Sequence, residues 1–203
     1  MLIRKNNNTQ TTTNFKEYEF FSKSFNSPDH HFVDDLLIGA IQHIRTHFGV
    51  PIEITSSFRT LLHNTAIGSS TTSQHLFGLA LDFKFLQNNK TLIKEFNEDI
   101  LSQGVLFQEL RSYGINAFGI YDTFIHIDVR LNEEEFGFEY ENESTYGGSF
   151  AYWDLTKKKV YESPLTLLKA FFSEDGFKGT KSAIYTMLIV FLFPYMSYRI
   201  LKK

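Results

Sequence analysis

Two segments of the chain, residues 78–85 and residues 123–130, alternate between apolar residues and small or polar residues. This two-residue period is typical of β-strands, in which successive side chains point to opposite faces of a sheet. In the first segment Asp82 falls on the face of the small residues, and in the second His126 lies between two isoleucines. Each strand should therefore bury one face in a core and present small and polar groups on the other.

Other patterns predict helices that cover the apolar face of this sheet. Apolar residues between Asp29 and Phe48 recur at helical spacing, and Gly49 follows as a natural stop. Residues 92–113 predict one or two further helices. Additional strands are expected at residues 51–57, 117–121 and 149–161. We therefore predict an α+β fold: a small, mostly antiparallel sheet with helices packed against one side and a cleft on the other.

The composition of the chain divides it into four segments. Residues 1–13 are polar and rich in Asn and Thr, so we expect a flexible arm. Residues 14–161 should form the folded domain, and residues 162–181 a short helix and a linker. Residues 182–203 form a hydrophobic tail with basic residues on both sides of its uncharged part. Although Pro194 interrupts this run, its length and flanks predict a transmembrane helix.

The absence of cysteine limits the chemistry that is open to this chain. Disulfides, thiolate zinc sites, iron–sulfur clusters and a cysteine nucleophile are excluded, so any metal must be held by histidine and carboxylate groups. The formal net charge of -3 argues against nucleic acid as a partner.

Three residues form a candidate metal site of this kind. His75 and Asp82 stand seven residues apart in SQHLFGLALD, and His126 follows in FIHIDVR. Two imidazoles and one carboxylate suit zinc and leave a fourth position for water. Since Asp82 and His126 lie on the small or polar faces of two predicted strands, all three groups can converge on one ion.

These residues also carry a resemblance to a known family. The chain reads Ser73-x-His75-x-x-Gly78-x-Ala80-x-Asp82, followed by His126-x-Asp128 and preceded by Ser56-Ser57-Phe58-Arg59. This order of motifs resembles the zinc D-Ala-D-Ala carboxypeptidase/endopeptidase family, peptidase family M15, over roughly residues 15–153. The resemblance implies a D-Ala-D-Ala carboxypeptidase/Hedgehog-like fold with its zinc cleft on the side of the sheet opposite the helices.

The resemblance also implies roles for individual residues. His75, Asp82 and His126 would bind Zn²⁺. Arg59 would face the substrate carboxylate or the developing oxyanion, for which a forked, permanently charged guanidinium is suited. Ser73 would either hydrogen-bond the substrate or cap its loop.

The chain departs from the family pattern at the general base. Many members carry Glu or Asp three residues before the third ligand, where this chain has Thr123. On a strand, Asp122 and Asp128 share a face with His126, so either carboxylate is a candidate for the base. Asp128 could instead orient a histidine ligand.

The expected function is zinc-dependent hydrolysis of a peptide bond in the stem peptides of bacterial peptidoglycan. A terminal D-Ala-D-Ala bond and an internal L-Ala-D-Glu bond are both open. No apolar signal segment follows Arg4 and Lys5, which favours a phage lytic or virion-associated enzyme over a secreted host enzyme. With the tail, we expect a membrane-anchored protein that acts on the cell wall. The alternative is a catalytically silent, zinc-containing wall-binding or membrane-attached structural protein.

Overall fold

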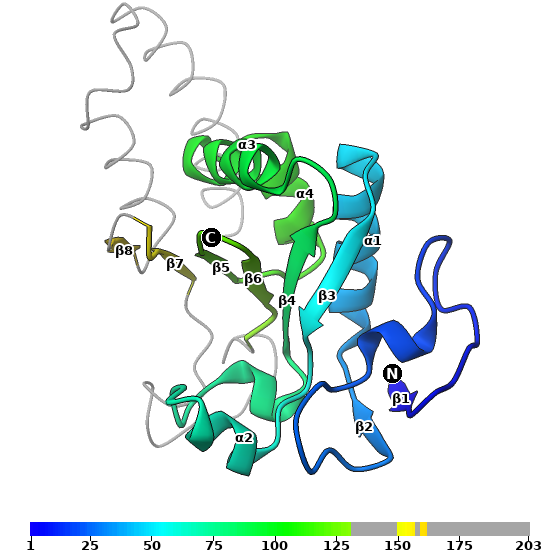
Figure 1. Ribbon diagram of the computed structural model, residues 1–203. Coiled ribbons are helices and arrows are strands. Elements are labelled where there is room, and N and C mark those ends of the chain that lie inside the picture. Colours follow the sequence, from blue (N-terminus) through cyan, green and yellow to red (C-terminus); the bar gives the residue numbers. More distant parts are fainter. Residues whose placement is uncertain (131–149, 157–158, 162–203) are drawn as a thin grey trace, which may run out of the picture. The chain divides into compact units, whose positions relative to one another are not determined.

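The computed structural model describes residues 1–130, 150–156 and 159–161 (Figure 1). They all belong to one compact unit, Met1–Leu168. The predicted short helix, linker and hydrophobic tail, residues 162–203, lie outside the described residues. Within the part of the chain that is described, no helix combines the length and hydrophobicity needed to cross a membrane.

A six-stranded sheet organises the fold, with the strand order β3-β4-β6-β5-β7-β8. All neighbouring strands in it are antiparallel except β5 and β7, which run parallel. The predicted α+β class is confirmed, and the sheet is mixed because of this one parallel pair. The strands are β3 (Ile52–Ser56), β4 (Ala80–Phe85), β5 (Ala117–Ile120), β6 (Ile125–Asp128), β7 (Ala151–Asp154) and β8 (Lys159–Tyr161).

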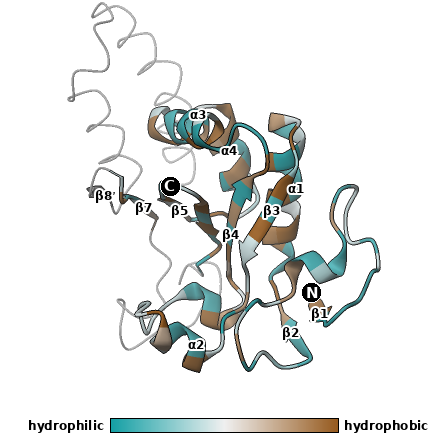
Figure 2. Ribbon diagram, in the orientation of Figure 1, coloured by the Kyte–Doolittle hydropathy of each residue, from teal (hydrophilic) through white to brown (hydrophobic). Residues whose placement is uncertain are grey.

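Three longer helices cover the apolar face of the sheet (Figure 1). They are α1 (Asp35–Phe48), α3 (Asn89–Ser102) and α4 (Val105–Ser112). Their buried aliphatic and aromatic residues join one core with the alternate residues of β4 and β6, such as Leu81, Phe83 and Ile127. Figure 2 shows hydrophobic residues on α1 and along β3, where this core lies. The predicted arrangement of helices on one side is therefore present.

Local chemistry explains the limits of α1. The side chain of Asp34 accepts a hydrogen bond from the backbone N–H of Leu36, which satisfies a free donor at the helix start. At the other end Gly49 adopts a left-handed conformation with φ 66° and closes the helix. The helix begins later than the predicted Asp29 because His30–Phe32 forms a separate strand, β2.

The N-terminal segment differs from the flexible arm expected for residues 1–13. Leu2–Arg4 forms strand β1, which pairs antiparallel with β2. Ile3 is fully buried, and the Arg4 side chain forms an ion pair with Glu17 at the start of a 3₁₀ helix, η1 (Glu17–Phe20). The sequence pattern did not predict the order of this segment, because the pairing with β2 and the Arg4–Glu17 ion pair both join residues that are distant along the chain.

Residues 58–77 connect β3 to β4 and contain a short helix, α2 (Leu61–Ala66), and a second 3₁₀ helix, η2 (Gln74–Phe77). The Thr60 side chain caps α2 by accepting from the His63 N–H. Gly78 ends η2 with φ 71°, and a Cβ at this position would collide with the carbonyl of Phe32. These two elements carry side chains to the uncovered face of the sheet.

Candidate metal centre

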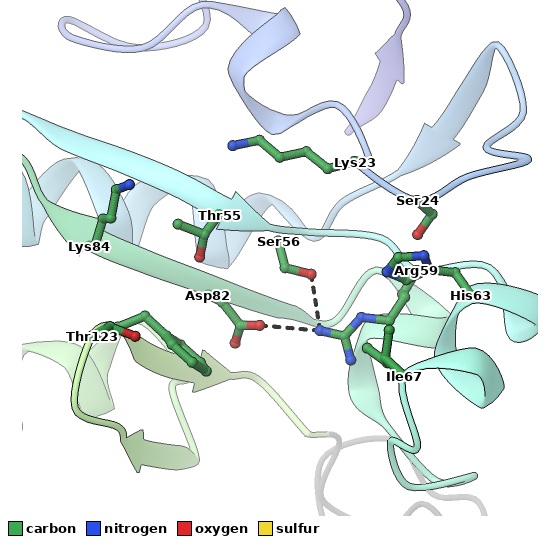
Figure 3. A pocket seen from close by; sticks show the side chains of 11 residues that line it. Lys23, Ser24, Thr55, Ser56, Arg59, His63, Ile67, Asp82, Lys84 and Thr123 are labelled. Atoms are coloured by element: carbon green, nitrogen blue, oxygen red, sulfur yellow. Dashed lines mark hydrogen bonds and ion pairs between the residues drawn. The ribbon is translucent and has the colours of Figure 1, made fainter.

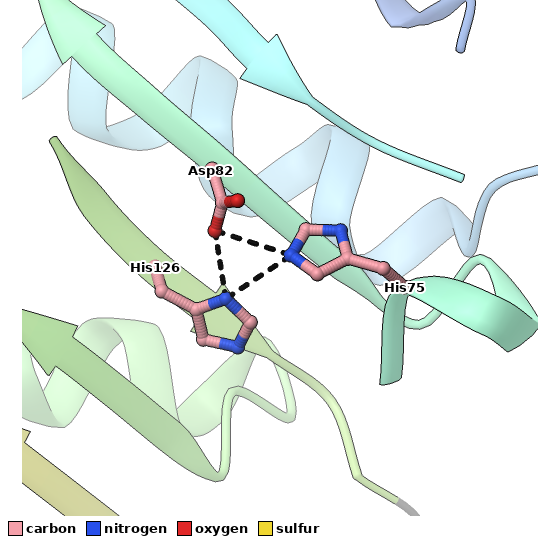
Figure 4. Close-up of side chains that lie close together, drawn as sticks. All are labelled: His75, Asp82 and His126. Carbon is pink, nitrogen blue, oxygen red and sulfur yellow. Dashed lines mark hydrogen bonds and ion pairs between the residues drawn. The ribbon is translucent and has the colours of Figure 1, made fainter. Parts of the chain in front are cut away.

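Three elements bring the predicted metal ligands together. Asp82 on β4 lies directly opposite His126 on β6 in the antiparallel register, so both side chains stand on the face of the sheet without helices. His75 lies in η2, which immediately precedes β4. Figure 4 shows the three side chains converging, with Asp82 and one nitrogen of each ring pointing toward a common centre.

The distances between the ligand atoms suit a small tetrahedral ion. Asp82 Oδ1 lies 2.8 Å from His126 Nδ1 and 3.1 Å from His75 Nε2, and the two nitrogens are 3.3 Å apart. Ligand atoms bound to zinc at about 2.0–2.1 Å with tetrahedral angles are about 3.3 Å apart. The side chains are buried, and their donor set contains only nitrogen and oxygen. The three residues therefore fit a zinc ion.

Each histidine is held by its other ring nitrogen. His75 Nδ1 lies 2.5 Å from the carbonyl oxygen of Ser57, so an N–H there donates to that oxygen. His126 Nε2 lies 3.0 Å from Asp128 Oδ2 and donates in the same way. In these tautomers His75 Nε2 and His126 Nδ1 present their lone pairs to the centre, as metal ligands must.

The charges in the centre favour a bound cation. Burial opposes ionisation of Asp82, but the two histidines outweigh it and hold its pKa well below the usual range. Burial also lowers the pKa of His126, but hydrogen bonds to Asp128 and Asp82 raise it overall, to about 9. The pKa of His75 is lowered, mainly by burial. Without a metal, a proton on His126 therefore supplies the positive charge between two carboxylates.

Arg59 lies beside the metal centre, at the second oxygen of Asp82. Its guanidinium donates to Asp82 Oδ2 at 3.2 Å and to Ser56 Oγ at 3.0 Å. Figure 3 shows both contacts. The other terminal nitrogen of Arg59 donates to Ser69 Oγ at 3.2 Å and to Asn64 Oδ1 at 3.4 Å. The backbone N–H of Arg59 also donates to the carbonyl of His75, which ties the two loops together. Arg59 therefore lies beside the metal centre, and its predicted role toward a substrate stays a prediction.

The two candidate carboxylates for the base have different surroundings. Asp128 is fully buried and accepts hydrogen bonds from His126 Nε2 and from the Arg130 side chain and backbone. Asp122 is exposed at the bend between β5 and β6. Thr123, which stands where many family members carry the base, lines the groove beside the metal centre.

Among the described residues, the Ser73 side chain forms no hydrogen bond with the candidate metal ligands. It occupies the N-cap position of η2, but its side chain forms no capping hydrogen bond. Its backbone carbonyl accepts from Leu76 instead. Among the described residues, Ser73 is also absent from the lining of the groove.

A groove of about 440 Å³ opens next to the centre. Figure 3 shows how side chains from several elements surround it. Lys23 and Lys84 both pair with Glu53 at one side, at 3.1 Å and 2.9 Å. The lining is Lys23, Ser24, Thr55, Ser56, Arg59, His63, Ile67, Asp82, Lys84, Thr123 and Phe124. This mixture of cationic and hydroxyl groups suits a polar ligand that carries negative charge.

The sequence patterns missed two aromatic residues on the same face. Gly119 of β5 lies between Trp153 on β7 and His126 on β6 in the register of the sheet. The centres of the Trp153 and His126 rings are 5.0 Å apart. Tyr121 follows β5 and accepts a hydrogen bond from the Trp153 indole at 3.2 Å. No motif points to either residue, although Trp153 is the one tryptophan of the chain.

Comparison with known proteins adds a family assignment. The profile of the Peptidase M15 family matches residues 13–128, more than half of the chain. None of the curated proteins matches the chain at a significant level. The family match includes all three candidate metal ligands, Arg59 and Asp128, and it ends before β7. These residues and their convergence in one buried centre agree with the predicted resemblance, and the chain belongs to the Peptidase M15 family.

Proposed function

We propose that this protein is a zinc-dependent peptidase that hydrolyses a peptide bond in the stem peptides of bacterial peptidoglycan. The observation that carries the proposal is the convergence of His75, Asp82 and His126 at the edge of a polar groove, with Arg59 beside them. A buried triad that serves only the fold would not need an open groove at its side.

The side chains of the site support this chemistry as follows. A bound zinc ion would supply a water of lowered pKa and would polarise the scissile carbonyl. Arg59 would place a fixed positive charge close to the oxygen on which negative charge develops. Asp128 would orient the His126 ring, and Asp122 would accept the proton of the attacking water. Asp122 is chosen because the oxygens of Asp128 are already engaged by His126 and Arg130.

The groove supports a short, anionic peptide as the substrate. Lys23 and Lys84 share one partner, Glu53, so together they leave an excess positive charge along one wall. The hydroxyls of Ser24, Thr55 and Thr123 add donors and acceptors for a peptide backbone. Both a terminal D-Ala-D-Ala bond and an L-Ala-D-Glu bond have a carboxylate close to the scissile carbonyl.

Purified peptidoglycan, incubated with the protein with and without a chelator, tests this function. Mass spectrometry of the products should show new peptide ends that depend on zinc and that identify the cleaved bond. His126→Ala should abolish both zinc binding and cleavage. His43→Ala is the matched control, since His43 lies on α1 and pairs with Glu109 away from the site. Zinc-loaded protein that releases no peptide would refute the peptidase.

A specific observation favours a second candidate, a zinc-containing module that binds the wall without cutting it. Thr123 lines the groove where many family members place the base, and Asp122 is not part of the lining. In that case the zinc-loaded protein should sediment with peptidoglycan, and the wall should remain intact. Binding without products would support this candidate, whereas turnover would exclude it.

We also propose that the hydrophobic tail attaches the protein to a membrane, so that the catalytic unit acts on the adjacent wall. The support is the uncharged, apolar sequence of residues 182–198 and the basic residues that flank it.

A further inference from the structure

A pair of aromatic residues lies on the site face of the sheet, partly outside the region that matches the family. Tyr121 comes two residues after Gly119 and therefore extends from the same face as Gly119 and His126. Trp153 stands opposite Gly119 on the parallel neighbour, β7. Trp153 thus lies in the cross-strand row that contains the candidate ligands Asp82 and His126, and Tyr121 lies two residues away from this row along the chain.

Gly119 makes room for the indole. A Cβ at this position would overlap the ring atoms of Trp153, so the absence of a side chain lets the ring cross β5. The ring then reaches His126, and the guanidinium of Arg130 lies 5.7 Å from its centre. The same Arg130 holds Asp128, which holds His126. Trp153 is therefore fixed by contacts with the residues around the metal centre.

The indole in turn fixes the hydroxyl of Tyr121. Trp153 Nε1–H donates a hydrogen bond to the Tyr121 oxygen. The hydroxyl therefore acts as an acceptor toward the indole, and its own proton can be donated to another group. Among the described residues, the indole is the hydroxyl's one hydrogen-bond partner. The Tyr121 ring is stacked on Phe124, 4.0 Å away, and Phe124 lines the groove. The phenol is thus held on two sides, by the indole and by Phe124, a residue of the groove.

The phenol also lies within electrostatic reach of the site. Burial raises the pKa of Tyr121, the indole N–H lowers it, and the charges of Asp82 and Arg59 act on it in opposite directions. The pKa of the Tyr121 phenol is therefore raised overall, and the phenol is a neutral donor at neutral pH.

The Arg59 guanidinium is less available as a donor than the Tyr121 hydroxyl. Both terminal nitrogens of Arg59 are committed to protein acceptors, which are Asp82, Ser56, Ser69 and Asn64. Arg59 can therefore contribute its charge, but it would have to break existing bonds to donate to a substrate. A tetrahedral oxyanion needs directed donors, and each such donor is worth much more in the transition state than in the ground state.

We propose that the Tyr121 hydroxyl donates a hydrogen bond to the oxyanion formed at the scissile carbonyl, and that Trp153 is the positioning residue that holds it there. The phenol keeps its proton throughout, so it needs no proton exchange with solvent. This inference rests on the proposed peptidase function.

Tyr121→Phe tests the proposal, because it retains the stacked ring and removes only the hydroxyl. With peptidoglycan peptides as substrate, kcat should fall about tenfold to a hundredfold while KM changes little. The zinc content and the thermal midpoint should stay those of the parent protein. Tyr113→Phe is the matched control, since Tyr113 packs beside His43 at the end of α4. Trp153→Phe should lower kcat less, and it should add little to Tyr121→Phe, because the indole acts through the hydroxyl.

A second measurement does not need turnover. Inorganic phosphate, a tetrahedral oxyanion, can be titrated into the zinc-loaded protein while the fluorescence of the single tryptophan, Trp153, is followed. Tyr121→Phe should weaken phosphate binding several-fold, and Tyr113→Phe should not. If the parent protein cleaves nothing, the peptidase proposal fails, and this titration still tests the donor.

Two results would overturn the inference. Unchanged kcat together with unchanged phosphate affinity in Tyr121→Phe would mean that the hydroxyl does not meet an oxyanion. Loss of zinc or a large fall in the thermal midpoint would assign Tyr121 to the fold.

Discussion

At the scale of single residues, the contacts of a carboxylate separate the two acidic candidates. Asp128 accepts hydrogen bonds from Arg130 and from His126 Nε2, the ring nitrogen that points away from the metal centre. Asp122 is exposed and precedes Thr123, which lines the groove. Asp128→Asn should therefore weaken zinc binding by about tenfold to a hundredfold. Asp122→Asn should leave zinc binding intact and lower the rate by about a hundredfold or more.

Zinc titrations and single-turnover rates of the two variants measure these effects side by side. The asparagines are close in size to the aspartates, so the variants differ mainly in charge. Parent-like zinc affinity in Asp128→Asn, combined with a large loss of rate, would transfer the role of base to Asp128.

The pKa of His126 leads to a second prediction at this scale. Because two carboxylates raise it to about 9, the ring is protonated at neutral pH when no metal is bound. Zinc must displace this proton, so binding should release about one proton at neutral pH and should strengthen about tenfold per pH unit up to that pKa. Above it the ring is already neutral, and the dependence on this group should end. His75 adds no second proton, since burial lowers its pKa.

Calorimetric titrations of zinc in buffers with different heats of ionisation count the released protons. The measured heat should change with the buffer by about one ionisation enthalpy per zinc. Zinc affinity that stays constant from pH 6.5, the ordinary pKa of histidine, to pH 9 would contradict the assigned charge state.

The two-residue period of the strands was sufficient to predict that the candidate ligands Asp82 and His126 share one face of the sheet. The sequence could not predict how the rings of His75 and His126 are oriented. His75 is held by the carbonyl of Ser57, a backbone group that shows no preference in sequence. The sequence also left open whether Asp128 acts as the base or orients His126. The hydrogen bonds from Arg130 to both Asp128 oxygens bear on this choice, and they form only in the folded protein.

At the scale of elements, the pairing of β5 with β7 brings the Trp153 ring beside His126. It depends on Gly119, because any side chain there would overlap the Trp153 indole. Gly119→Ala should therefore displace the indole and destabilise the protein by about 1–3 kcal/mol, the usual cost of overpacking. The fluorescence of Trp153 should shift toward longer wavelength as the ring becomes exposed.

Denaturant unfolding monitored by circular dichroism measures the free energy, and fluorescence reports on the ring. Adding Trp153→Ala to Gly119→Ala is the control, since it removes the obstructing ring. Gly119→Ala should then cost less stability in the Trp153→Ala background than in the parent protein. If Gly119→Ala is as stable as the parent and leaves the fluorescence unchanged, the indole does not cross β5 at this point.

Element prediction was most successful where the pattern was long and local. The stripe of apolar residues in α1 needed no tertiary information, and neither did the alternation in β4. It was least successful for β1, whose three residues pair with β2 about thirty positions later. A three-residue strand is too short to show a periodic signal, and its order comes from burial of Ile3 and from the Arg4–Glu17 ion pair.

At the scale of the whole molecule, the proposed membrane anchor would set where the catalytic unit acts. Residues 182–198 carry no charge, Lys178 and Lys181 precede them, and Arg199 follows. An apolar segment of this length gains free energy in proportion to the apolar area that it removes from water. The full chain should therefore float with vesicles of neutral phospholipid, and it should stay bound in high salt because apolar burial is not screened. A chain that ends at Gly176 should remain in the aqueous fraction and keep its zinc.

A matched variant separates insertion from simple loss of the tail. Ile189→Asp in the full chain preserves length and flanking charges, but a carboxylate at the middle of a spanning helix costs about 3 kcal/mol. This variant should bind vesicles much more weakly than the parent, whereas Thr186→Ser should bind equally well. If the full chain is monodisperse in plain buffer and stays with the aqueous fraction, the anchor is refuted. If Ile189→Asp floats as well as the parent, contact with lipid would have to come from another surface.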